Sequence, residues 1–246
     1  MIWEVDATRM AINAAVQSSS VEFPGDGAVI RAFLSRPTSA GPRPAVVIIH
    51  EYWGLNDHMR ELAERFVREG YVALVPDLYS RFGSPVAKDA QEAGKLMGQL
   101  SSQQALKDLN AATKYLNTQP FVDAPLIGAV GFCMGGTFSL MMAANNSDIK
   151  ASVTFYGQIP PSDTFKYFLC PILFLYGGQD DWVPKADVER LRQGLQELGK
   201  PGEVRIYPTA GHAFFNDTRP EVYKPAEARD VWQRVLAFLK AHLSLV

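Results

Sequence analysis

Residues 126–136 read Leu-Ile-Gly-Ala-Val-Gly-Phe-Cys-Met-Gly-Gly, and this stretch decides the fold class. It begins as an apolar run of the length of a buried strand and leads into a helical segment over 135–144. The pattern Gly-x-Cys-x-Gly at its centre has the spacing of a nucleophile elbow, with sulfur in place of serine oxygen. Small residues are required on both sides because larger ones would collide in so tight a turn. The stretch therefore predicts that Cys133 stands above a sheet edge, at a helix N-terminus that favours negative charge.

This cysteine and its turn have two alternative interpretations. A free cysteine is most often a buried core thiol, and this is our interpretation of Cys170, which has no glycine frame. A glycine-rich strand-to-helix turn can also open a dinucleotide-binding unit, but the required G-x-G-x-x-G is missing. The acid of that unit should end the next strand, whereas Asp148 precedes it. The nucleophile is therefore the favoured interpretation of Cys133.

Short β-branched runs alternate with helical segments on both sides of the turn, which indicates an α/β fold with a mostly parallel sheet. We find no repeat or composition shift, so residues 1–246 are expected to form a single domain. Residues 1–18 are an N-terminal extension in which 10–16 could form a short helix or lie on the surface. A polar stretch over 80–102 is expected to be irregular. We expect strands at 20–23, 29–34, 45–49, 71–75, 126–132, 151–156, 172–176 and 204–207, and helices at 57–70, 106–116, 135–144, 186–198 and 231–242. Asp57 is the expected N-cap of the first of these helices.

The composition excludes several classes of function. The 246 residues carry 24 Lys and Arg against 26 Asp and Glu, so no basic field exists to bind nucleic acid. No apolar stretch approaches the ~20 residues that span a bilayer, and the N-terminus lacks the basic and apolar regions of a secretion signal. The two cysteines fit a reducing compartment. We expect a cytoplasmic protein without membrane contact.

A nucleophile on such an elbow needs an acid and then a histidine at the ends of later strands. Asp180 is the first acid after the strand at 172–176, and we favour it over Asp181. His212 follows a glycine in the loop after the strand at 204–207. The remaining histidines are His50, in the loop after the third strand, and His58 and His242, which we expect to be solvated on amphipathic helices.

Five ordered blocks resemble the dienelactone hydrolase family of α/β-hydrolases. The likeness extends from Val21 to the last helix, and several blocks matching in order are more specific than any one. It implies an α/β-hydrolase fold with helices on both faces of the sheet. The blocks are 50–56 (His-Glu-Tyr-Trp-Gly-Leu-Asn), 76–81 (Pro-Asp-Leu-Tyr-Ser-Arg), 131–136, 178–180 (Gly-Gln-Asp) and 211–214 (Gly-His-Ala-Phe).

The resemblance also implies roles for individual residues. It implies a triad of Cys133, His212 and Asp180, with Glu51 as an auxiliary carboxylate near the thiol. The backbone N–H groups of Tyr52 and Met134 would form an oxyanion hole, an arrangement that agrees with the general hydrolase layout. Arg81 would lie in the substrate pocket. The chain departs from the family pattern, which holds a lactone carboxylate with two arginines, because Asn216 stands at the second arginine position.

The hypothesis that follows is hydrolysis of a small ester or lactone through a thioester on Cys133, with no cofactor and no metal. A broad carboxylesterase or thioesterase is the alternative within enzymes, and a non-catalytic binding module with Cys133 as a redox sensor is the alternative outside them. The histidines have no metal-ligand spacing. A monomer or a small homo-oligomer is expected.

Two further expectations concern the pocket. We expect Glu51 to hold the resting thiol neutral, the alternative being a solvent-facing glutamate. Arg219 could replace the missing second arginine if its loop folds back, and Arg81 could instead be a surface residue. The resulting pocket would be more aromatic than charged and would prefer neutral or singly charged esters. Its expected substrate-binding residues are Arg81, Tyr79, Phe82, Tyr156, Trp182, Phe215 and Asn216.

Overall fold

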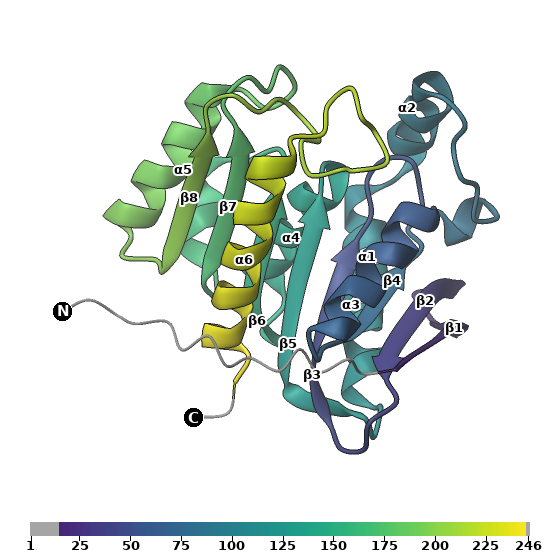
Figure 1. Cartoon of the computed structure of the whole chain (residues 1–246). Coiled ribbons are helices and arrows are strands. Elements are labelled where there is room, and N and C mark those ends of the chain that lie inside the picture. The colour runs from purple at the N-terminus through teal and green to yellow at the C-terminus, as the bar shows by residue number, and fades with distance from the viewer. Residues whose placement is uncertain (1–14, 245–246) are drawn as a thin grey trace.

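A single eight-stranded sheet runs through the computed structural model, which describes residues 15–244 (Figure 1). The strand order is β1-β2-β4-β3-β5-β6-β7-β8. The pairs β1 with β2 and β2 with β4 are antiparallel, and every other pair is parallel, which confirms the predicted mostly parallel sheet. The strands are β1 (Val16–Pro24), β2 (Val29–Pro37), β3 (Arg43–Ile49), β4 (Val72–Pro76), β5 (Val122–Phe132), β6 (Ile149–Phe155), β7 (Ile172–Gly177) and β8 (Gly202–Tyr207).

Helices cover both faces of this sheet. Figure 1 shows α1 and α6 in front of it and α3 and α4 behind it. No helix within residues 15–244 has the length and apolar character needed to cross a membrane. The helices are α1 (Asp57–Arg68), α2 (Ala90–Gln99), α3 (Ser102–Asn117), α4 (Met134–Asn145), α5 (Lys185–Glu197) and α6 (Pro225–His242), with 3-10 turns η1 (Ser80–Phe82) and η2 (Ser162–Tyr167).

The central strands explain why the site lies at one edge of the sheet. Residues 45–49 of β3 are fully buried, as expected for a strand covered on both faces. Strands β3, β5, β6, β7 and β8 run parallel, so their carboxyl ends meet at one edge, and the loops that leave this edge carry the polar residues singled out above.

Three expectations about the elements are wrong. The stretch 80–102 is not irregular, because α2 forms there with Asp89 as its N-cap. Helix α1 is capped by Asn56, whose side chain accepts a hydrogen bond from the backbone N–H of Met59, and Asp57 is its first helical residue. Residues 16–18 already belong to β1 rather than to an extension. The rest of the expected extension, 1–14, lies outside the described residues.

Candidate active site

Cys133 sits on a strained turn between β5 and α4. Its backbone has φ 55° and ψ −118°, a conformation that non-glycine residues rarely adopt and that the surrounding structure must hold in place. A Cβ at Gly131 would lie 1.9 Å from the carbonyl oxygen of Gly135, and one at Gly135 would lie 2.1 Å from that of Ile49. A larger residue at either glycine would therefore collide with backbone atoms, and the turn that the two glycines permit is the predicted elbow.

His212 and Asp180 meet at this edge of the sheet. His212 Nδ1 lies 2.8 Å from Asp180 Oδ2, and the Asp180 side chain is fully buried. The other oxygen, Asp180 Oδ1, accepts the backbone N–H groups of Trp182 at 2.8 Å and Val183 at 2.9 Å. Both carboxylate oxygens are thus fixed, which orients the imidazole and leaves Nε2 for another partner. The favoured acid, Asp180, is the one that contacts His212.

Two backbone donors converge on the sulfur of Cys133. Burial raises the pKa of the Cys133 thiol well above its usual range, and the Glu51 carboxylate raises it further. The backbone N–H groups of Met134 and Tyr52 hydrogen-bond the sulfur and lower that pKa in part. These are the two donors that the family resemblance implies, and in this structure both reach the sulfur of Cys133.

Glu51 is buried beside the thiol, only 2% exposed, so the solvent-facing alternative is wrong. Its Oε2 accepts a hydrogen bond from Asn216 Nδ2 at 2.9 Å, and the Tyr156 hydroxyl donates to Oε1 at 3.4 Å. Asn216 Oδ1 accepts the backbone N–H of Thr218 at 3.1 Å, which fixes the orientation of the amide because a backbone N–H can only donate. Burial raises the pKa of Glu51, opposed by His212 and by the hydrogen bond from Asn216.

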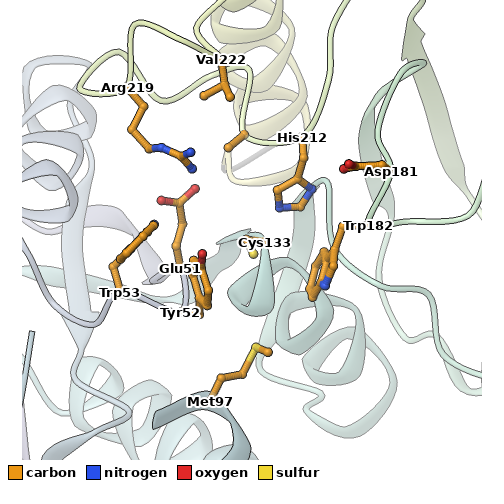
Figure 2. Close-up of a pocket in the computed structure, with 11 residues that line it drawn as sticks. Glu51, Tyr52, Trp53, Met97, Cys133, Asp181, Trp182, His212, Arg219 and Val222 are labelled. Atoms are coloured by element: carbon orange, nitrogen blue, oxygen red, sulfur yellow. The ribbon is translucent and has the colours of Figure 1, made fainter. Parts of the chain in front are cut away.

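A pocket of about 310 Å³ opens above these groups (Figure 2). Cys133, Glu51 and His212 contribute to its wall together with Tyr52, Trp53 and Trp182. Met97, Asp181, Ala213, Arg219 and Val222 complete the lining. Figure 2 shows Arg219 reaching toward the Glu51 carboxylate from the loop that follows His212. The loop does fold back, and it brings a guanidinium into the pocket.

Arg81 corrects a prediction, because it lies elsewhere. Its guanidinium makes a bidentate pair with Asp108 of α3, at 2.9 Å and 2.8 Å, and donates to the carbonyl of Asp26 at 2.8 Å. Arg81 is therefore neither on the wall of the main pocket nor simply a solvated surface residue. The cation on that wall is Arg219, whose guanidinium lies 5.7 Å from the Trp53 ring and whose Nε donates to Glu221 at 2.9 Å.

The expected aromatic residues separate into one that lines the pocket and four that do not. Trp182 lines it and packs edge-on against His212, with ring centroids 5.0 Å apart. Tyr79 is buried and donates to the carbonyl of Tyr52 at 2.9 Å, and Tyr156 lies behind Glu51 and His212. Phe215 stacks in the core and Phe82 lies outside the main pocket. The expected pocket residue Asn216 also lies behind the wall, bonded to Glu51.

The sequence did not single out Trp53, Met97 or Val222 as pocket residues. Trp53 belongs to the matching block at 50–56 and could have been found there. Met97 lies on the unexpected helix α2, where the spacing of Ala93, Met97 and Leu100 at i, i+4 and i+7 could have indicated it.

His58 is also misplaced by the sequence analysis, since it is buried rather than solvated. Burial lowers its pKa to about 4, and its Nδ1 lies 3.5 Å from Asp217. Within residues 15–244, His58, Glu61 and Asp217 form the one group with metal-ligand geometry. Arg65 already pairs with both carboxylates, so a guanidinium supplies the positive charge there. His242 is exposed as expected, and His50 is buried.

Comparisons with known proteins agree with this geometry. Residues 30–243 match the dienelactone hydrolase family. A "putative carboxymethylenebutenolidase" of Escherichia coli K12 is 34% identical over 241 residues, covering 93% of this chain and 88% of its own.

Two solved structures extend the comparison. The "putative dienelactone hydrolase" of Klebsiella pneumoniae superposes with a TM-score of 0.86 at 32% identity, covering 92% of this chain and 98% of its own. An α/β-hydrolase from a deep-sea metagenome library gives a TM-score of 0.72 at 16% identity, with 95% and 100% covered, a likeness of fold alone. The fold is that of the α/β-hydrolases.

Proposed function

The chain belongs to the dienelactone hydrolase family, and from this premise we propose that it hydrolyses small esters or lactones with Cys133 as nucleophile. The observation that carries the proposal is the presence of three independent features around one pocket. The elbow raises Cys133, two backbone N–H groups bond its sulfur, and a histidine with its Nδ1 fixed by Asp180 lines the same pocket. A binding module has no physical need for all three.

The first half of the reaction forms a thioester. His212 Nε2 takes the thiol proton, and Cys133 Sγ attacks the carbonyl carbon of the substrate. The N–H groups of Tyr52 and Met134, which bond the sulfur at rest, then hold the oxyanion of the tetrahedral intermediate. When the intermediate collapses, the alcohol oxygen leaves with the proton of His212 and the acyl group stays on sulfur.

The second half releases the acid. His212 takes a proton from water, the hydroxide attacks the thioester carbonyl, and the thiolate of Cys133 leaves. Asp180 stabilises the imidazolium in both halves because its carboxylate accepts a hydrogen bond from the Nδ1–H of His212.

Glu51 controls the state of the thiol between turnovers. Its carboxylate opposes formation of the thiolate, so the resting sulfur stays protonated and is protected from oxidation. Asn216 and Tyr156 hold the carboxylate in that place. Substrate that displaces Glu51 removes the opposing charge and allows the thiol to ionise.

The substrate class follows from sulfur and from the charges on the wall. A thiolate leaves a tetrahedral intermediate more readily than an alkoxide does, so esters with stabilised leaving groups, such as aryl esters and enol lactones, are favoured over amides. Arg219 is the cation of the wall, and Glu221 offsets part of its charge. We therefore expect neutral or singly charged esters, whereas a dicarboxylate would be poorly held. Cytoplasmic location and a monomer or small homo-oligomer stay predictions.

Hydrolysis of p-nitrophenyl acetate tests the proposal. Cys133→Ala should lower kcat/KM at least about a thousandfold, whereas Cys170→Ala, which changes a buried thiol outside the pocket, should keep the wild-type rate. Wild-type protein, mixed with the ester and quenched with acid during the first turnovers, should carry an acetyl adduct on Cys133 detectable by mass spectrometry. Undiminished turnover in Cys133→Ala, or an adduct on another residue, would contradict the proposed nucleophile.

A further inference from the structure

A second cavity of about 250 Å³ adjoins the main pocket and shares two walls with it, Met97 and Trp182. Met97 of α2, Leu100 just after that helix and Ser102 at the start of α3 form one side. The first turns of α4, with Met134 and Phe138, form another. The two cavities therefore adjoin at Met97 and Trp182.

The chemistry of the second cavity suits a hydrocarbon. Among residues 15–244, those that line it carry no charged side chain. Leu100, Met134 and Phe138 give it an apolar side, and Ser102, Thr137 and Gln158 give it an uncharged polar one. The Thr137 hydroxyl on its wall already accepts the backbone N–H of Gln158 at 2.9 Å. An alkyl chain that enters this cavity leaves water and desolvates no charge there.

The orientation of the substrate in the pocket follows from the groups that contact its carbonyl and its leaving oxygen. In the proposed reaction the leaving oxygen faces His212, toward the part of the main pocket near Ala213 and Val222. Figure 2 shows Met97 on the other side of Cys133 from Val222 and Arg219. The acyl substituent therefore points away from Val222, toward Met97 and the second cavity behind it.

We propose that the second cavity is an acyl subsite, and that the favoured substrates are esters whose acyl part is an unbranched apolar chain longer than acetyl. This inference rests on the proposed ester hydrolysis. The main pocket, at about 310 Å³, is at the lower end of the range of about 300–1,000 Å³ typical of ligand pockets, so a long acyl chain needs the added space. Met97, an unbranched and flexible side chain on the shared wall, can shift to admit such a chain.

The test is a series of p-nitrophenyl esters with acetyl, butyryl, hexanoyl and octanoyl groups, which changes only the acyl part. For the wild type, kcat/KM should rise about threefold to fourfold per added methylene until the cavity is full, as expected for burial of a methylene. Ser102→Trp and Gln158→Trp fill the cavity from different walls, and each should flatten this rise. Gln103→Trp places the same indole on the neighbouring, exposed residue of α3 and should keep the wild-type slope.

The outcomes separate this inference from the proposed function. If acetate is hydrolysed but the wild-type series is flat, or the rise survives in both cavity-filling variants, the acyl subsite is wrong and the esterase remains. A gain that follows the length of the leaving alcohol in a series of alkyl acetates, and not the acyl chain, would equally overturn the assignment. If no ester of the series is hydrolysed, both proposals fail.

Discussion

Two regions that border the same pocket are built in opposite ways. The first, the strand-edge region, consists of the elbow and the loops after β7 and β8, which hold Cys133, Asp180 and His212. Asp180 is fixed there by hydrogen bonds, and backbone atoms leave no space for a Cβ at Gly131. Helix α2, on the other side, buries only Ala93 and contains Gly94 and Gly98, where an added Cβ would meet open space. The first region fixes the groups that are proposed to react, and the second has room for larger side chains at Gly94 and Gly98.

We therefore expect the strand-edge region to determine the rate of hydrolysis and the α2 region to determine which ester is preferred. A substitution at the strand edge should change kcat or prevent folding, whereas one in α2 or its neighbourhood should change which ester is preferred. The following substitutions test this division, beginning with the largest expected effect.

Asp180→Asn should lower kcat on p-nitrophenyl acetate about a thousandfold to ten-thousandfold, because an amide in this place presents the wrong partner to His212 Nδ1. Asp181→Asn is the matched variant, since its carboxylate lines the pocket and no contact joins it to His212 among the described residues. It should act mainly on KM. Steady-state kinetics on both variants measure the two effects. Equal losses of kcat would mean that the choice of Asp180 over Asp181 as the partner of His212 is wrong.

Gly131→Ala should destabilise the fold by more than about 3 kcal/mol, because its Cβ would meet backbone atoms that cannot move aside. Urea unfolding followed by circular dichroism measures the loss, and failure to obtain folded protein counts as the extreme of the same effect. A variant with wild-type stability would show that the turn can relax, and the argument for a rigid elbow would fall.

Glu51→Gln should make Cys133 more acidic, since it removes the neighbouring carboxylate that raises the thiol pKa. Alkylation by iodoacetamide, in a Cys170→Ala background so that one thiol is followed, should become about tenfold faster near pH 8 and reach its plateau at lower pH. The rise with pH has the same sign in both proteins because the thiolate is the reactive form. Superimposable rate profiles would exclude control of the thiol by Glu51.

Gly94→Ala, in the middle of α2, should stabilise that helix by about 0.5–1 kcal/mol, because alanine favours the helix and its methyl group meets no neighbour. Amide hydrogen exchange within residues 90–99 should slow accordingly, with little change in β5. Slower exchange in both regions would mean that α2 unfolds together with the sheet, and the two regions would then form one cooperative unit.

The strand-edge region could be predicted from sequence because its signals are local. Gly-x-Cys-x-Gly, an acid just after a strand and a histidine just after a glycine each lie within a few residues of the element that positions them. The pocket wall depended on contacts between distant residues. Arg81 was expected on the pocket wall, but its partner Asp108 lies 27 residues further along the chain. No residue near Arg81 in the sequence indicates that pair.

Helix α2 was missed for a related reason. Its apolar residues Ala93, Leu96 and Met97 do recur at helical spacing, but only one is fully buried, and its two glycines argue against a helix. His58 is different, because the sequence did hold a signal for its burial. It stands four residues before Leu62 and eight before Phe66, on the apolar face of α1, and the same spacing that identified the helix could have placed it.

Tyr79 was expected to touch the substrate, and its actual contact has a consequence for the energetics of the reaction. Its hydroxyl ties down the carbonyl of Tyr52, at 2.9 Å, in the loop whose N–H reaches the sulfur. A dipole that is already oriented does not have to reorganise when negative charge develops on the substrate. Tyr79 holds the peptide that directly follows the proposed donor N–H, so its removal would let this loop reorganise more when charge develops on the substrate, although Tyr79 itself does not line the pocket.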